Sequence, residues 1–205
     1  MSNGANECMG VCNHEEADSR LIVHIEHALQ NGASSCLVRT VDTDVIVILV
    51  GMIHVFTGIC PTADIWVAFG SGKHYKYYHI NQIANSLGMQ SARVLPLFHS
   101  FTGCDTTSAF FGKGKKTSWQ AWKSYPDVTE AFMYMVDHPF TAVEITSPHF
   151  RTIERFTISM YNKNSANHLV NEERRDLFCK KNKSMDNIPP TQVLLFSRYE
   201  QKYEK

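Results

Sequence analysis

The stretch SCLVRTVDTDVIVILVG, residues 35–51, decides how the first half of this chain folds. It is rich in β-branched side chains and almost continuously apolar, which is typical of a strand buried on both faces in a parallel sheet. We therefore predict one buried strand over this stretch. Because side chains alternate along a strand, Asp42 and Asp44 would lie on the same face of it.

The neighbouring segments alternate between helical and strand patterns. The pattern predicts a helix over residues 15–31, a strand over 63–69, a turn and short strand over 70–80, a helix over 81–88 and an apolar helix over 91–103, kinked or begun at Pro96. Such alternation favours an α/β fold, with a mostly parallel sheet flanked by helices.

The pattern changes in the second half of the chain. Residues 118–125, 128–138 and 149–163 are amphipathic at helical spacing. We therefore predict an α/β core over residues 1–110 and, over residues 111–205, a turn followed by a helical subdomain.

Composition limits the class of protein. Of 205 residues, 43% are hydrophobic and 20% charged, as expected for a globular domain. No apolar run approaches the roughly 20 residues that span a bilayer, and the N-terminal residues lack a signal-peptide pattern. We expect no membrane association and an intracellular location. The irregularly spaced cysteines favour reduced thiols; Cys8, Cys12 and His14 could instead belong to a zinc site, although no fourth ligand is evident.

Charge is unevenly distributed along the chain. Residues 1–110 carry nine acids and five bases, a net charge of −4, and residues 111–205 carry eleven acids and fifteen bases, a net charge of +4. An acidic half beside a basic half suits a metal site next to a polyanion track. An imbalance of this size is also compatible with chance.

Acidic residues gather where elements are predicted to begin or end: Glu15, Glu16, Asp18, Asp42, Asp44 and Asp105. Helix capping and turns explain single acids of this kind. Asp42 and Asp44 are harder to explain, because two close carboxylates in an apolar site need a cation and only Arg39 is nearby. Oxygen ligands favour Mg²⁺ or Mn²⁺, and a structural hydrogen-bond network is the open alternative.

Three segments together resemble a known superfamily. HEEADSRL, residues 14–21, resembles the Glu-Ala-Asp helix start of the flap endonuclease and 5′-to-3′ exonuclease superfamily, which has a PIN-like fold. VDTDVIVILV, residues 41–50, resembles its Asp-x-Asp motif. GCDTTSAFFGKGKKT, residues 103–117, resembles its Gly-x-Asp segment and the helix-hairpin-helix turn that follows. IPPTQVLLFSRYEQ, residues 188–201, extends the similarity to a branch associated with mobile elements.

The resemblance implies a nuclease that hydrolyses phosphodiester bonds with two Mg²⁺ or Mn²⁺ ions. Its catalytic acids and metal ligands would be Glu16, Asp18, Asp42, Asp44 and Asp105, with Glu15 as the rival of Glu16. The turn would grip a nucleic-acid backbone through Gly112, Lys113, Gly114, Lys115 and Lys116. The expected partner is nucleic acid, DNA rather than RNA, and the expected location is the nucleus.

The superfamily's first strands, with their own aspartates, have no counterpart before Glu15. A missing N-terminal segment or a second chain would then complete the sheet, or the chain would be a degenerate copy. The alternative function is therefore a catalytically inactive module that binds nucleic acid or protein. Trp66, Trp119 and Trp122 are most simply packing residues, although Trp119 or Trp122 could stack on bases behind the turn.

Overall fold

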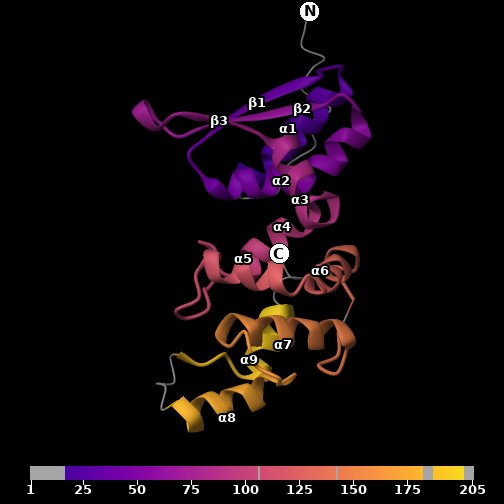
Figure 1. Ribbon diagram of the computed structural model, residues 1–205. Coiled ribbons are helices and arrows are strands. Elements are labelled where there is room, and N and C mark those ends of the chain that lie inside the picture. The colour runs from indigo at the N-terminus through magenta and orange to yellow at the C-terminus, as the bar shows by residue number, and fades with distance from the viewer. Residues whose placement is uncertain (1–16, 106, 142, 182–186, 201–205) are drawn as a thin grey trace, which may run out of the picture. The chain divides into compact units, whose positions relative to one another are not determined.

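The computed structural model describes residues 17–105, 107–141, 143–181 and 187–200, and the chain divides into two compact units, residues 1–95 and 96–205 (Figure 1). The first unit contains α1 (Ala17–Gln30), β1 (Ser35–Thr40), α2 (Thr43–Ile59), β2 (Asp64–Phe69), a 3₁₀ turn (Gly72–His74), β3 (Lys76–His79) and α3 (Ile80–Leu87). Helix α4 (Met89–Phe101) includes the division, and α5 (Lys115–Ser124), α6 (Val128–Asp137), α7 (Pro148–Tyr161), α8 (Val170–Lys181) and α9 (Gln192–Glu200) follow.

The sheet is small and mixed. Its order is β1-β2-β3, with β1 parallel to β2 from Ser35↔Asp64 to Thr40↔Phe69. Strand β3 is antiparallel to β2, with Trp66 opposite His79. The predicted α/β class with flanking helices is confirmed. The described sheet is not mostly parallel, since one of its two strand pairs is antiparallel.

The prediction of one buried strand over residues 35–51 was wrong. The strand ends at Thr40, and the most apolar part of the stretch forms α2. Asp42 is the N-cap of that helix: its backbone is extended (φ −96°, ψ 128°), and its carboxylate accepts a hydrogen bond from the Asp44 amide at 2.8 Å. A continuous apolar run fits a buried helix as well as a buried strand, so the cap decides between them.

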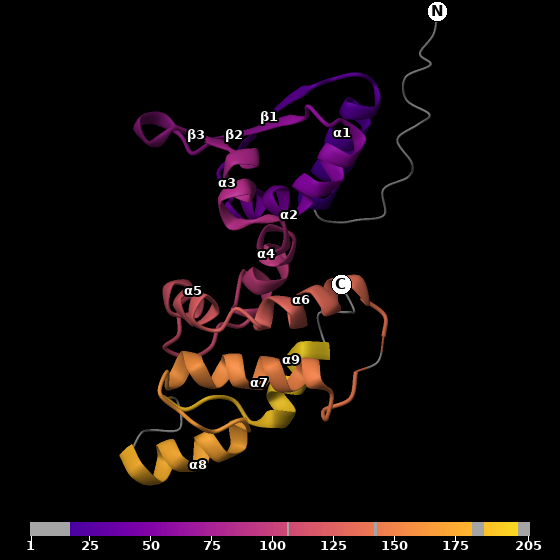
Figure 2. The same ribbon diagram turned by 45° about the vertical axis from the view of Figure 1, so that its right-hand side comes forward.

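The core of the first unit lies between one face of the sheet and helices α1, α2 and α3 (Figures 1 and 2). Val38, Ile65 and Val67 point from the strands toward Leu49 and Phe56 of α2, and all five are buried. Alternation along the strands therefore places Leu37, Arg39, Trp66, Ala68, Tyr77 and His79 on the opposite face.

Most other predicted elements match the structure. The helix predicted over 15–31 is α1, the segment 63–69 contains β2, and 81–88 corresponds to α3 with Gly88 at its C-terminal cap (φ 81°). Pro96 neither begins nor ends a helix but lies inside α4, which starts seven residues earlier.

The second unit is helical around α7. Helices α5, α6, α8 and α9 all contact α7. Phe156 of α7 is fully buried and packs against Phe98, Phe101 and Phe132. Trp122 is also buried and donates to Thr129 Oγ1 at 2.8 Å, which supports a packing role for it. None of the described helices is both long and apolar enough to span a membrane.

Candidate acidic site and glycine-lysine turn

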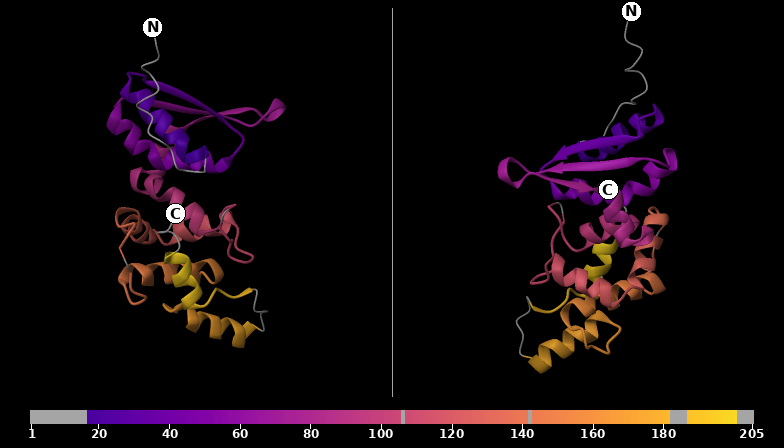
Figure 3. Two further views of the ribbon diagram at one scale, coloured as in Figure 1. Left: turned by 180° about the vertical axis from the view of Figure 1, so that it is seen from behind. Right: turned by 45° about the horizontal axis from the view of Figure 1, so that its top comes forward.

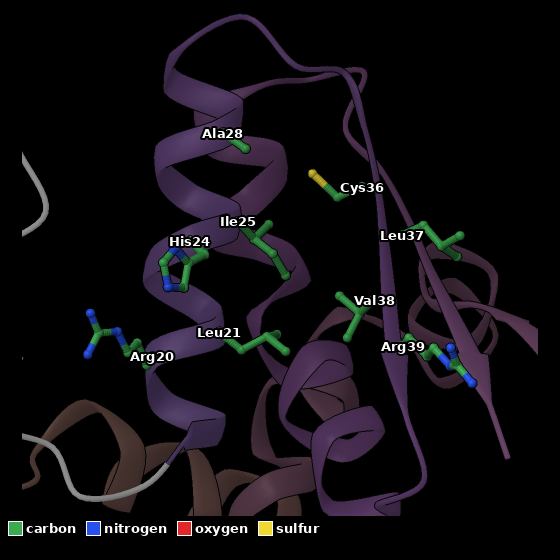
Figure 4. A pocket seen from close by; sticks show the side chains of 9 residues that line it. All are labelled: Arg20, Leu21, His24, Ile25, Ala28, Cys36, Leu37, Val38 and Arg39. Carbon is green, nitrogen blue, oxygen red and sulfur yellow. The ribbon is translucent and has the colours of Figure 1, made fainter. Parts of the chain in front are cut away.

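Helix α1 runs back along β1, so the N-terminal end of the helix meets the carboxyl end of the strand. Residues of both elements line one cavity. Ala28, late in α1, lies near Cys36, and Leu21, early in α1, lies near Val38 (Figure 4). Asp18 is in the first turn of α1, and α2 begins directly after β1. The topology thus brings Asp18 to the same end of the unit as Asp42 and Asp44.

Asp42 and Asp44 are held by the start of α2 rather than by a strand face. Thr40 Oγ1 accepts from the Asp42 amide at 3.0 Å, and Asp42 Oδ1 accepts from the Asp44 amide. Asp42 is exposed and Asp44 is half-buried. Both carboxylates lie at the N-terminal, positive end of the α2 dipole and within reach of solvent. The two acids therefore need no buried cation, contrary to the reasoning from a strand.

The remaining predicted ligands are distributed differently. Glu15, Glu16, Cys8, Cys12 and His14 lie outside the described residues. Asp105 is exposed and belongs to the second unit, whereas Asp18, Asp42 and Asp44 belong to the first. Within the described ranges, no three His, Cys, Asp or Glu side chains form a group that could hold a metal ion.

The loop that carries Asp105 is tightly built. Thr107 Oγ1 donates to the Ser100 carbonyl at 2.7 Å, and the Cys104 and Thr107 backbones form an isolated β-bridge. Gly103 has φ 101°, and a Cβ at this position would lie 2.4 Å from the Ala109 Cα. The segment before and after Asp105 is therefore fixed by backbone contacts.

The glycine-lysine turn is a short hairpin followed by a helix start. Phe110 and Lys113 form a β-bridge, with the Lys113 amide donating to the Phe110 carbonyl at 3.0 Å. Gly112 adopts φ 65° inside this turn, a conformation that glycine tolerates best. Gly114 is the N-cap of α5 and makes no side-chain cap, and its carbonyl accepts from the Thr117 amide at 3.0 Å.

The three lysines of the turn have different surroundings. Lys115 donates from Nζ to the His99 carbonyl and, at 2.9 Å, to Thr102 Oγ1, so it binds the C-terminal end of α4. Lys113 Nζ lies 4.8 Å from the centre of the Tyr161 ring. Lys116 is exposed on the first turn of α5. Of the three, Lys116 is the best placed to meet a phosphate from solvent.

A polar group that sequence reasoning missed lies on the sheet. Asp64 accepts from Trp66 Nε1 at 2.8 Å and pairs with His79 Nε2 at 2.6 Å. The hydrogen bond from Trp66, and then His79, lower the pKa of Asp64 below its usual value. The only signal in the sequence was the spacing of Asp64 and Trp66, which puts both on one strand face.

Strand β1 and helix α1 also border a cavity of about 490 Å³. Its lining is mostly apolar and also includes Arg20, His24 and Arg39. In Figure 4 the Arg39 side chain points away from α1, to the far side of β1. Among the described strands, β1 has a neighbour on one side only.

Comparison with known proteins found no protein family, no curated protein and no solved structure that matches this chain.

Proposed function

We propose that the chain is a PIN-like, divalent-metal-dependent nuclease domain that hydrolyses phosphodiester bonds in nucleic acid. The observation that carries the proposal is the position of Asp18, Asp42 and Asp44 at the carboxyl end of β1. Ligands of open α/β sheets bind at this edge, because loops there are free to carry functional groups. The ordered resemblance of three motifs to the flap endonuclease superfamily supports the same reading.

The described acids fit part of a metal site. Their donors are all carboxylate oxygens, the ligands that Mg²⁺ and Mn²⁺ prefer. No three described His, Cys, Asp or Glu side chains form a metal-binding group, so the proposal relies on Glu15 or Glu16, outside the described residues, to complete the set. When bound, the ions would supply positive charge that activates water and stabilises the oxygens of the phosphodiester.

The chain's own contribution is to hold charge in place. The start of α2 fixes the Asp42 carboxylate through its hydrogen bond with the Asp44 amide. In the second unit, Lys116 and the first amides of α5 would bind a backbone phosphate, since helix N-termini attract anions. Lys115 would act indirectly by fixing α5 to the end of α4.

The free edge of β1 supports a proposal about partners. The cavity beside β1 has a mostly apolar lining. On the edge away from β2, β1 has no neighbour among the described strands. A strand from a second chain would pair there and cover the cavity.

A second candidate is a catalytically inactive module that binds nucleic acid or protein. Exposed Lys116 and the exposed aromatic side chains of the sheet favour binding whether or not hydrolysis occurs. The two candidates differ in one measurable property, which is cleavage that depends on the ionised acids.

The test uses Asp42→Asn, because asparagine caps a helix about as well as aspartate and removes only the charge. Cleavage of branched and single-stranded DNA is measured with Mg²⁺ or Mn²⁺, and Mn²⁺ binding is followed by calorimetry. A nuclease predicts that the variant melts as the wild type does but loses metal binding and at least about 100-fold of its cleavage rate.

Asp127→Asn is the matched control, since Asp127 is exposed at the start of α6 and makes no side-chain cap there. Its cleavage should equal that of the wild type. Cleavage that survives Asp42→Asn unchanged contradicts the acidic site. Binding of DNA without any cleavage supports the inactive module.

A further inference from the structure

The face of the sheet that points away from α1, α2 and α3 carries an unusual set of side chains. Residues that pair across the strands form two rows, Leu37–Trp66–His79 and Arg39–Ala68–Tyr77. Tyr75 precedes β3 and adjoins the second row. We call these residues and Tyr75 the aromatic face. In Figure 3, right, the strands lie in front of the helices of their own unit.

Large side chains on this face are exposed to solvent. Tyr77 is 61% exposed, Leu37 63% and Tyr75 37%. Leaving aromatic surface in water forfeits the burial that would stabilise the fold, so such a group marks a binding surface. The face is not a loose cluster, because Tyr75 and Tyr77 pack edge to face with centroids 5.4 Å apart.

Trp66 and His79 fix the other end of the aromatic face. Their rings are stacked, with centroids 4.3 Å apart and planes 2° from parallel, and both bind the Asp64 carboxylate. Trp66 and His79 are thus held by each other. The exposed tyrosines, in contrast, have ring surface available to a ligand.

Positive charge accompanies the tyrosines. Arg39 is exposed, and its guanidinium lies 6.0 Å from the centre of the Tyr75 ring. Lys73, in the turn between β2 and β3, precedes Tyr75 and is exposed. Lys76 begins β3 and pairs with Phe69, so alternation places it on the other face of the sheet. The sequence contains no acidic residue from Ile65 to Cys104. Asp64 is the acid on this face, and it lies at the opposite end of β2 from the Arg39 row.

We propose that the aromatic face binds single-stranded nucleic acid, with bases stacked on Tyr77 and Tyr75 and phosphates beside Arg39 and Lys73. Sheets with exposed aromatic rings bind unpaired bases because every base presents a flat surface to stack on. Flanking cations meet the charge of the backbone. A duplex would not bind in this way, since its bases are already stacked.

The charges also argue against a second copy of the chain as the occupant. Two copies meeting face to face would bring the positive charges of Arg39 and Lys73 from both copies into one interface, and like charges there would repel. A polyanion with flat groups satisfies both the cations and the rings.

This inference deepens the nucleic-acid binding on which the proposed function rests, and it does not require hydrolysis. It is tested in EDTA, so a chain that cleaves nothing can still bind. Fluorescence anisotropy measures the affinity of the full chain for a labelled 12-nucleotide oligo-dT, for an abasic oligonucleotide of equal length and for a duplex. Stacking predicts that the abasic strand binds at least about 5-fold more weakly than oligo-dT.

Substitutions locate the effect. Tyr77→Ala should weaken oligo-dT binding by about 5-fold or more, whereas Tyr77→Phe should retain it, because stacking needs the ring and not the hydroxyl. Phe140→Ala is the control: Phe140 is 91% exposed in the second unit and should not affect binding. Circular dichroism melting confirms that each variant is folded.

Three results would overturn the inference. These are equal binding of oligo-dT and the abasic strand, wild-type binding by Tyr77→Ala, and no binding of any strand. Sedimentation gives a separate outcome: a dimer that Tyr77→Ala dissociates would assign the aromatic face to a second copy of the chain instead.

Discussion

At the scale of single residues, Gly103 shows most directly how sequence constrains the loop before α5. Its φ of 101° is one that side chains rarely adopt, and the Ala109 backbone lies where a Cβ would be. Gly112 also has a positive φ, of 65°. A Cβ added there would have Asn187 Oδ1 as its nearest neighbour, at 3.9 Å, which is an ordinary contact. The first glycine is required by space and conformation together, and the second by conformation alone.

We predict that Gly103→Ala destabilises the chain far more than Gly112→Ala does. The first substitution should cost at least about 3 kcal/mol, because strain is added to a clash with backbone. The second should cost about 1–2 kcal/mol, the usual penalty of a left-handed residue. Urea unfolding of both variants measures the difference, and equal costs would contradict the close approach to Ala109.

Tyr161 gives a prediction for alkaline pH. Burial raises its pKa to about 12, despite the opposing effect of Arg198 and Arg174. A raised pKa in the folded state means that stability is complete below about pH 10 and is lost as pH rises toward 12. Tyr161→Phe should therefore melt as the wild type does at pH 8 and lose less stability than the wild type between pH 10 and 12. Identical pH profiles would show that the phenol is not protected.

At the scale of elements, α2 is where sequence reasoning and structure differ. Residues 45–50 are apolar without a break, so their pattern has neither the alternation of a strand nor the stripe of a surface helix. Asp42 as N-cap favours the helix, and the core around Leu49, Ile53 and Phe56 buries it. The Asp-Thr-Asp sequence, residues 42–44, is a local signal for the start of a helix, but it is also compatible with the end of a strand.

The candidate site could be predicted only in part, because the sequence shows local spacing and not the packing of distant elements. The sequence brought Asp42 and Asp44 to attention because of their spacing, and this remains useful although they cap a helix. That Asp18 lies at their end of the unit depends on α1 running back along β1, which no residue pattern states. The Asp64–Trp66–His79 group depends on pairing between β2 and β3, and so it was missed.

Lys115 and Lys116 test how α5 is attached. Lys115→Met should destabilise the chain by about 1–2 kcal/mol, since it removes a charged donor from the His99 carbonyl and Thr102. Lys116→Met should be within about 0.5 kcal/mol of the wild type, because Lys116 is exposed. Thermal melting compares the two. For duplex DNA binding we expect the opposite order of the two variants. Lys116→Met should lose affinity although its stability is unchanged, because Lys116 belongs to the proposed backbone clamp.

At the scale of the whole molecule, the chain has two compact units, each with a buried core of its own. Leu49, Ile65 and Phe56 lie at the centre of the first, and Phe156 and Phe132 at the centre of the second. A substitution in one core should therefore affect its own unit most.

Leu49→Ala tests this expectation. Removing a fully buried leucine should cost about 2–5 kcal/mol, through lost burial and a cavity. Amide hydrogen exchange should accelerate in β1, β2 and α2, and much less in α7. Phe156→Ala is the reciprocal variant, which should accelerate exchange in α7 and leave α2 nearly unchanged. Equal acceleration in both units after either substitution would show that the chain unfolds as one.

The sequence by itself determined the α/β class, most helix and strand positions, and which carboxylates deserved attention. These follow from local periodicity, caps and glycine conformations, which act over a few residues. Tertiary structure alone decided that residues 43–59 are a helix, that the sheet is mixed, and that Tyr75 and Tyr77 share an exposed face with Arg39. Those features depend on contacts between segments that are distant in the sequence. The free energy of such contacts depends on both segments, so the pattern of one segment does not predict it.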